Sequence, residues 1–294
     1  MVARNLVSFL FAISIFGCIT PHGFKQHGEF VKSELVDNPE VSINYLQSEA
    51  DNFQLHYREV GIAKNAVAIW IHGTPGNWTD SAYLYRDKSF TSQVKLIMLD
   101  RPGWGLSQFK SKPRLVTSFT EISRLIQPLL IKLKADNPNV PLILLGHSWG
   151  GSVVPTIALN NSNLVDGVIV LAAGLDPELT YPRWYNRFAS TYLGNALIGQ
   201  GFRLANDEIY ALRPELLKQH DRWMEFKQPI IVVQGNKDKL VNPKNADYAE
   251  TVLAKKTSHV LRLSNQGHLL QLERMELIAK CISAISENNL AACS

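Results

Sequence analysis

Six short runs of mostly apolar residues recur along this chain of 294 residues. Each run is rich in leucine or β-branched side chains and is bounded by glycine, proline or polar residues. Continuous apolar runs of this length are typical of strands that are covered on both faces, as in a parallel sheet between helices. The runs lie at 67–73, 95–100, 141–148, 165–173, 229–235 and 259–264.

The segments around these runs complete an alternating pattern. Two strand-like segments, 41–46 and 53–61, come first, and the second alternates apolar and polar residues as a half-buried antiparallel strand does. Strands that then alternate with helices predict an α/β fold with a mostly parallel, doubly wound sheet and an antiparallel start. Helices are predicted at 117–135, with a kink at Pro128, and at 148–159, 245–253 and 268–285.

A long insertion, residues 175–228, interrupts this alternation after the sixth strand. Connections in such units usually have only a few residues, so the insertion predicts a helical cap over the carboxyl edge of the sheet. The core is then formed by residues 41–174 and 229–290. The cap is rich in aromatic residues, most of which we expect to hold it together. Candidates for the lining of a substrate pocket are Trp184, Tyr185 and Trp223.

The first 18 residues have the composition of an export segment. Arg4 precedes an apolar stretch, residues 6–17, that is shorter than the roughly 20 residues of a membrane span. Its end, IFGC, resembles a bacterial lipoprotein signal, which implies lipid attachment at Cys18 and a membrane-anchored protein. A conventional cleaved signal, giving a periplasmic or secreted protein, and an uncleaved anchor remain alternatives. Residues 19–40 are expected to be a tether.

Composition excludes several other classes. With 46% hydrophobic and 19% charged residues the chain has ample material for a globular core, and its net charge of +4 is spread along the sequence. No nucleic-acid partner is therefore expected. No cysteine or histidine pair has zinc-like spacing, so neither a metal nor another cofactor is predicted. Cys281 lies in an apolar helical pattern and is expected to be a buried thiol, and oligomeric state is left open.

Residues with catalytic chemistry follow three of the predicted strands. Ser148 stands in GHSWGG, where Gly146 and Gly150 would allow a sharp, strained turn from strand to helix. Asp238 follows a strand in GNKD, and His268 follows a later strand in NQGH. Ligands of parallel sheets bind at the carboxyl ends of the strands. A serine hydroxyl needs a histidine base, which a carboxylate orients, so these three types suggest nucleophilic catalysis.

Five motifs in order resemble those of the α/β-hydrolase-fold serine hydrolases. They are HGTPG at 72–76, DRPGWGLS at 100–107, GHSWGG at 146–151, GNKD at 235–238 and NQGH at 265–268. The resemblance implies a catalytic triad of Ser148, Asp238 and His268. It also implies that backbone N–H groups of Thr74 and Trp149 form the oxyanion hole.

Other residues compete for these roles. His72 and His147 could be bases, but His72 is expected to be a hydrogen-bonding residue of its loop, and His147 to point away from the serine. Asp176, which follows the sixth strand, is the alternative acid. Asp100 is better explained as a carboxylate that braces its loop.

The resemblance favours a carboxylesterase that acts on a small-molecule acyl substrate. Dehalogenases and epoxide hydrolases share the fold but use an aspartate at the position of Ser148, so their reactions are not expected. HGTPG is also similar to a motif of proline iminopeptidases, which keeps an aminopeptidase or amidase as the alternative. A surface-anchored binding module without catalysis is the alternative from another class, since fold does not fix function.

Overall fold

A computed structural model describes residues 38–294, and the export segment, Cys18 and most of the tether lie outside these residues. The strands of the described chain form one sheet in the order β1-β2-β4-β3-β6-β7-β8-β9, with β5 beside β2. The pairs β1/β2, β2/β4 and β2/β5 are antiparallel, and the others are parallel. The predicted α/β-hydrolase fold with an antiparallel start is confirmed. The strands are β1 Ser42–Ser48, β2 Phe53–Val60, β3 Ala66–Ile71, β4 Val94–Leu99, β5 Gln108–Phe109, β6 Leu142–His147, β7 Gly167–Leu171, β8 Ile230–Gly235 and β9 Ser258–Leu263.

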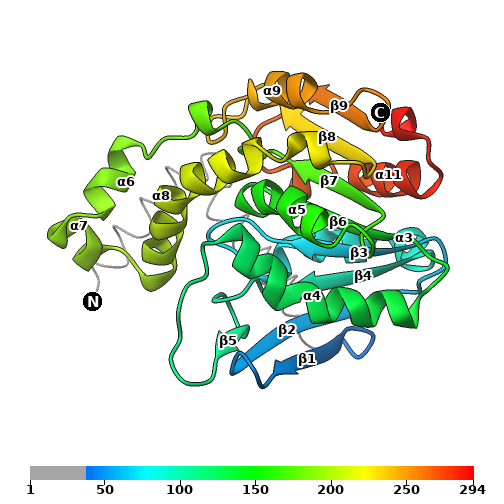
Figure 1. Ribbon diagram of the computed structural model, residues 1–294, viewed down its shortest axis with the longest axis horizontal. Helices are drawn as coiled ribbons and strands as arrows, with labels where there is room; N and C mark the ends of the chain where they lie inside the picture. Colours follow the sequence, from blue (N-terminus) through cyan, green and yellow to red (C-terminus); the bar gives the residue numbers. More distant parts are fainter. Residues whose placement is uncertain (1–37) are drawn as a thin grey trace.

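Helices cover both faces of the sheet (Figure 1). Alternate residues of a strand point to opposite faces, so Ile69 packs with α4, α5 and α9 while Trp70 packs with η2, α3 and α11. The helices are α3 Lys88–Thr91, α4 Phe119–Asp136, α5 Trp149–Asn160, α6 Trp184–Ala189, α7 Tyr192–Leu197, α8 Gln200–His220, α9 Asn245–Val252, α10 Leu270–Glu273 and α11 Met275–Ser286. The short 3-10 helices are η2 Trp78–Arg86, η3 Pro177–Leu179, η4 Trp223–Glu225 and η5 Leu290–Ala292.

Two helices differ from the sequence-based prediction. α4 continues through Pro128, and Ser118 caps its N-terminus by accepting a hydrogen bond from the N–H of Glu121. The region expected as one helix from His268 is divided into α10 and α11 at Arg274. His268 itself therefore lies in the loop after β9, where its side chain is available to a site.

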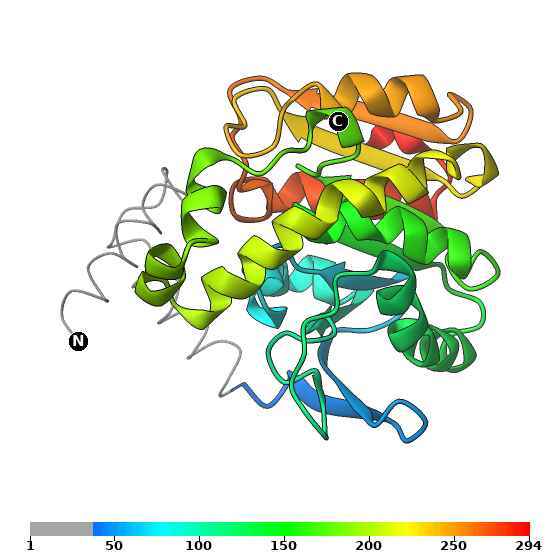
Figure 2. The same cartoon turned by 60° about the vertical axis from the view of Figure 1, so that its left-hand side comes forward.

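The segment between β7 and β8 forms a layer of its own. It contains η3, α6, α7, α8 and η4. Figures 1 and 2 show that α6, α7 and the first part of α8 project beyond the end of the sheet toward which the parallel strands point. These helices consequently lie over the strand ends that carry the chemistry-bearing residues.

A disulfide corrects the expectation for Cys281. Cys281 of α11 is bonded to Cys293, which follows η5, and both are fully buried. The pairing of Cys281 with Cys293 could not be predicted from their spacing. It depends on a turn that brings η5 back onto α11, and hydrophobic periodicity does not indicate that turn. No helix among residues 38–294 has the length and apolarity needed to cross a bilayer.

Candidate active site

Ser148 occupies a sharp turn between β6 and α5. Its φ of 53° and ψ of −122° lie in a region that a serine rarely adopts. The flanking glycines make the turn possible, because a Cβ on Gly146 would collide with the backbone oxygen of Gly150. A Cβ on Gly150 would collide with the backbone oxygen of Ile71 in the neighbouring strand. The prediction that the two glycines give space for a sharp turn at Ser148 is confirmed, and the role of Ser148 as a nucleophile stays a prediction.

Asp238 and His268 are joined by a hydrogen bond. The loop after β8 places Asp238 with one carboxylate oxygen 2.8 Å from Nδ1 of His268. The other oxygen accepts from the N–H groups of Leu240 and Val241, at 2.8 and 2.9 Å. Burial acts to raise the pKa of Asp238, but the His268 contact and these donors outweigh it, and the pKa lies below the usual value. An ionised Asp238 favours a proton on Nδ1 of His268, which would leave Nε2 with a free lone pair.

His72 and His147, the two other candidates for the base, make hydrogen bonds to the backbone. The Nε2 atom of His72 accepts from the backbone N–H of Arg101 at 3.0 Å, and its Nδ1 donates to the carbonyl of Gly73 at 2.8 Å. This confirms the loop-bracing role predicted for His72. His147 donates from Nε2 to the carbonyl of His268 at 2.9 Å, so it holds the backbone at His268. Burial lowers the pKa of His72 and His147 to about 3, which keeps both neutral.

The competing carboxylates also have structural partners. Asp100 is buried and accepts from the N–H groups of Trp78 and Leu106 and from Nδ1 of His56, as expected for a carboxylate that braces a loop. Asp176 caps η3 through the N–H of Glu178 at 2.8 Å. Asp238 is therefore the acid that the structure brings to His268.

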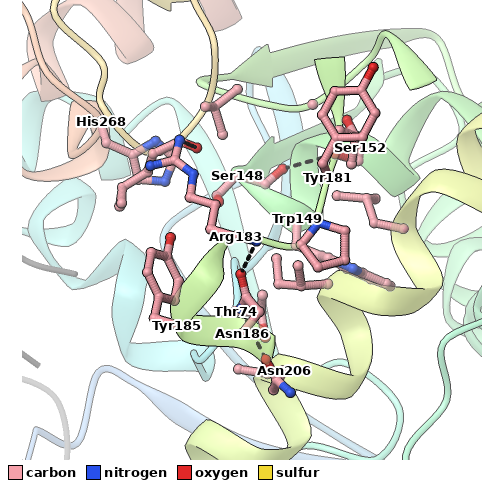
Figure 3. A pocket seen from close by; sticks show the side chains of 18 of the residues that line it. Thr74, Ser148, Trp149, Ser152, Tyr181, Arg183, Tyr185, Asn186, Asn206 and His268 are labelled. Atoms are coloured by element: carbon pink, nitrogen blue, oxygen red, sulfur yellow. Dashed lines mark hydrogen bonds between the residues drawn. The ribbon is translucent and has the colours of Figure 1, made fainter. Parts of the chain in front are cut away.

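Ser148, His268, Thr74 and Trp149 line one cavity of about 360 Å³ beneath the cap (Figure 3). This volume is in the range of small-molecule sites. The amide of Trp149 is the first of α5, so it has no acceptor within that helix. The Thr74 hydroxyl is buried without a partner among residues 38–294. The two residues stand where oxyanion donors are needed, and that role stays a prediction.

The cap aromatics divide into two groups. Tyr185 lines the cavity, as predicted. Trp184 and Trp223 do not, which corrects the expectation for both. Trp184 begins α6 with 77% of its surface exposed, and Trp223 is buried in the core against Phe226, with ring centroids 5.9 Å apart. Whether a cap aromatic lines the cavity depends on its position in the folded cap, which the residue type alone does not indicate.

We expect Tyr185→Ala to change the preference for acyl chain length, because the ring forms part of the cavity wall. Each methylene buried against such a wall contributes about 0.8 kcal/mol, or roughly fourfold in affinity. The measurement is kcat/KM across p-nitrophenyl esters of increasing length. Tyr192→Ala is the matched control, since Tyr192 is a cap tyrosine with 94% of its surface exposed. An equal effect of both variants would contradict this assignment.

A buried ion pair joins the HGTPG loop to the cap. Arg101 and Glu208 of α8 are both fully buried, with Nη1 and Oε1 2.6 Å apart. Arg101 also donates to the carbonyls of His72 and Gly73, each at 2.9 Å, directly before Thr74. Its guanidinium lies 4.2 Å from the ring centroid of Trp149. Sequence reasoning missed this cluster, although Arg101 lies within the DRPGWGLS motif.

Comparison with known proteins identifies the relatives of this chain. The model of a family described as "Alpha/beta hydrolase family" matches residues 68–280. Epoxide hydrolase 3 of Xenopus tropicalis is 26% identical over 53% of this chain, which spans 36% of that protein. A monoglyceride lipase homolog of Monkeypox virus is 22% identical over 52% of this chain and 58% of its own length.

Solved structures share the fold. A monoacylglycerol lipase of Paleococcus ferrophilus superposes with a TM-score of 0.61 at 16% sequence identity. The match covers 79% of this chain and 99% of the lipase. Identity this low supports similarity of fold alone, so the chemistry must be argued from the site.

Proposed function

Because the chain belongs to the alpha/beta hydrolase family, we propose that it is a serine hydrolase that cleaves carboxylic esters. The observation that carries the proposal is the hydrogen bond from His268 to Asp238, together with the cavity that His268 lines with Ser148, which occupies a strained turn. A hydroxyl, a neutral imidazole and an ionised carboxylate are the groups required to form and hydrolyse an acyl-enzyme.

The proposed reaction has two halves. His268 Nε2 removes the proton of Ser148 as its oxygen attacks the ester carbonyl, and the amides of Thr74 and Trp149 stabilise the oxyanion. The imidazolium then gives the proton to the departing alcohol, which leaves an acyl-enzyme. Water, deprotonated by the same imidazole, attacks the acyl group, and Ser148 departs with the proton. Asp238 stays ionised throughout and stabilises the imidazolium.

The serine at this turn argues against epoxide opening, despite the names of some relatives. Attack of a serine oxygen on an epoxide carbon would give an ether, which water does not readily hydrolyse. A carboxylate nucleophile would give an ester and could turn over. Ser148 is therefore suited to acyl transfer, and the epoxide reaction is not carried over to this chain.

The aminopeptidase alternative lacks a partner for a substrate ammonium group. None of the cap carboxylates lines the cavity. Glu208 is paired with Arg101, and Glu215 accepts from the N–H of Phe119 at 2.8 Å. The carboxylates of the cap are Asp176, Glu178, Asp207, Glu208, Glu215, Asp221 and Glu225.

A substrate panel tests the proposal directly. It contains p-nitrophenyl esters from acetate to palmitate, aminoacyl p-nitroanilides and styrene oxide, each assayed with wild-type protein and Ser148→Ala. Serine-dependent turnover of esters is the expected result. Turnover of anilides or styrene oxide without esters would contradict it, and no turnover of any member would favour the non-catalytic binding module.

The pH profile of kcat/KM should have one histidine-dependent limb. Activity is expected to rise with pH, because a histidine that serves as a base must be neutral to accept a proton. His72 and His147, with pKa values of about 3, are neutral throughout the range above pH 5 and add no limb there. The position of the limb should therefore be the same in His147→Gln as in the wild type. Loss of the limb in His147→Gln would contradict the assignment of the base.

We also propose that the protein is exported and lipidated at Cys18. The Cys281–Cys293 disulfide supports export, because such bonds persist mainly in oxidising compartments. The apolar stretch before Cys18 supports processing at that residue. Cell fractionation tests the lipid anchor. Wild-type protein should sediment with the membranes. The Cys18→Ser variant lacks the residue to which the lipid would be attached, so no lipid should hold it in the membrane fraction.

A further inference from the structure

One cation stands in the wall of the catalytic cavity. Among the lining residues that the structure describes, Arg183 is the single arginine or lysine, and none is an aspartate or glutamate. Figure 3 shows its side chain with those of Ser148 and His268 in this wall. Apart from the triad, the charge of the cavity is thus set by Arg183, which disfavours cationic substrates and favours anionic ones.

The guanidinium of Arg183 is held but not neutralised. Its Nη2 donates to the carbonyl of Leu240 at 2.8 Å. Its Nε and Nη1 groups have no acceptor, and it has no carboxylate partner, among residues 38–294. By contrast Arg213, another cap arginine, is paired with Glu178 at 2.6 Å. Arg183 therefore keeps donors available to a ligand.

The anchor of Arg183 places it on the side of the catalytic base. Leu240 follows Asp238 by two residues, and its N–H donates to the Asp238 carboxylate, which bonds His268. In the proposed reaction His268 delivers a proton to the departing alcohol. The alcohol half of the ester must then lie on this side of the cavity, within the region that Arg183 borders.

We propose that Arg183 selects esters whose alcohol half carries a carboxylate. The inference rests on the proposed esterase function and adds a substrate class to it. The remaining N–H groups of a guanidinium can donate charge-assisted hydrogen bonds to a carboxylate. A single carboxylate suits the site better than a phosphate dianion, because the part of the cavity wall formed by residues 38–294 holds no second lysine or arginine.

The test compares 4-acetoxybenzoate with its neutral analogue 4-acetoxybenzamide. The measured quantity is the ratio of kcat/KM for the two esters in each variant, so that differences in intrinsic reactivity cancel between variants. Arg183→Gln should lower the ratio by roughly fivefold to tenfold, a modest effect because the side chain is exposed. Arg183→Lys, which keeps the charge, should restore part of it.

Arg187→Gln is the matched control. Arg187 lies four residues further along, in helix α6, whose N-cap residue is Arg183, and it does not line the cavity. Its substitution should leave the ratio unchanged. A second ester pair, p-nitrophenyl hydrogen glutarate and p-nitrophenyl pentanoate, carries the carboxylate on the acyl half instead, and its ratio should not depend on Arg183.

Three results would overturn the inference. They are an unchanged ratio in Arg183→Gln, an equal change in Arg187→Gln, and a dependence on Arg183 that appears only with the acyl-side pair. In each case Ser148-dependent hydrolysis of 4-acetoxybenzamide would leave the esterase proposal standing. If folded wild-type protein hydrolyses neither aromatic ester but turns over other p-nitrophenyl esters, this inference fails and the esterase proposal stands. If it hydrolyses no ester at all, both fail.

Discussion

Ser148→Ala should reduce ester turnover by a factor on the order of 10⁶, with the fold unchanged. His268→Ala should have a similar effect, and the double variant should be no slower than either single variant. The reason is that a serine without its base, or a base without its serine, leaves only binding and oxyanion stabilisation. The measurement is kcat for p-nitrophenyl acetate, with circular dichroism to verify folding.

Ser152→Ala is the control for Ser148→Ala. Ser152 lies one turn along α5 and lines the same cavity, and its hydroxyl donates to the Ser148 carbonyl at 3.4 Å. Its removal deletes a hydroxyl from the site without touching the proposed nucleophile, and turnover should stay within about tenfold of wild type. A double variant much slower than both single variants would show that Ser148 and His268 do not act as one unit.

Glu208→Ala should destabilise the protein by about 3–5 kcal/mol. The substitution leaves the Arg101 guanidinium fully buried without its carboxylate partner. It also removes the acceptor of the Trp104 indole N–H, which lies 3.0 Å from Oε1 of Glu208. Denaturant-induced unfolding, followed by tryptophan fluorescence, gives the free energy of unfolding that checks this value.

Glu178→Ala provides the comparison for that loss. Glu178 is paired with Arg213, but the two side chains are 65% and 39% exposed. Solvent screens such a pair, and its loss should change the free energy of unfolding by less than about 1 kcal/mol. Equal effects of the two substitutions would contradict the account of Arg101 and Glu208 as a buried link between the HGTPG loop and the cap.

The parallel sheet could be predicted from the sequence because strands that are buried on both faces consist of continuous apolar runs. A strand such as β3 is apolar and buried throughout, and Gly146 and Gly150 indicate a backbone that cannot accommodate a Cβ. Asp238 and His268 were identifiable because parallel strands bring their carboxyl ends to one edge. Both predictions depend only on local sequence and on the order of strands and helices along the chain.

Contacts between distant segments could not be predicted in the same way. Arg101 and Glu208 are separated by 107 positions, and no sequence pattern at either residue indicates that the other is its partner. The roles of Trp184 and Trp223 depend on how the cap turns over the sheet, which places one in solvent and the other in the core. The Cys281–Cys293 bond and the position of Arg183 likewise depend on tertiary packing.

The central claim is that His268 activates Ser148 as a nucleophile. It is tested most directly by treating the folded protein with a fluorophosphonate and locating the adduct by peptide mass spectrometry. The account predicts one phosphonyl group on Ser148, formed in wild-type protein and greatly slowed in His268→Ala. Labelling at another residue, or no labelling of folded protein that hydrolyses esters, would contradict it.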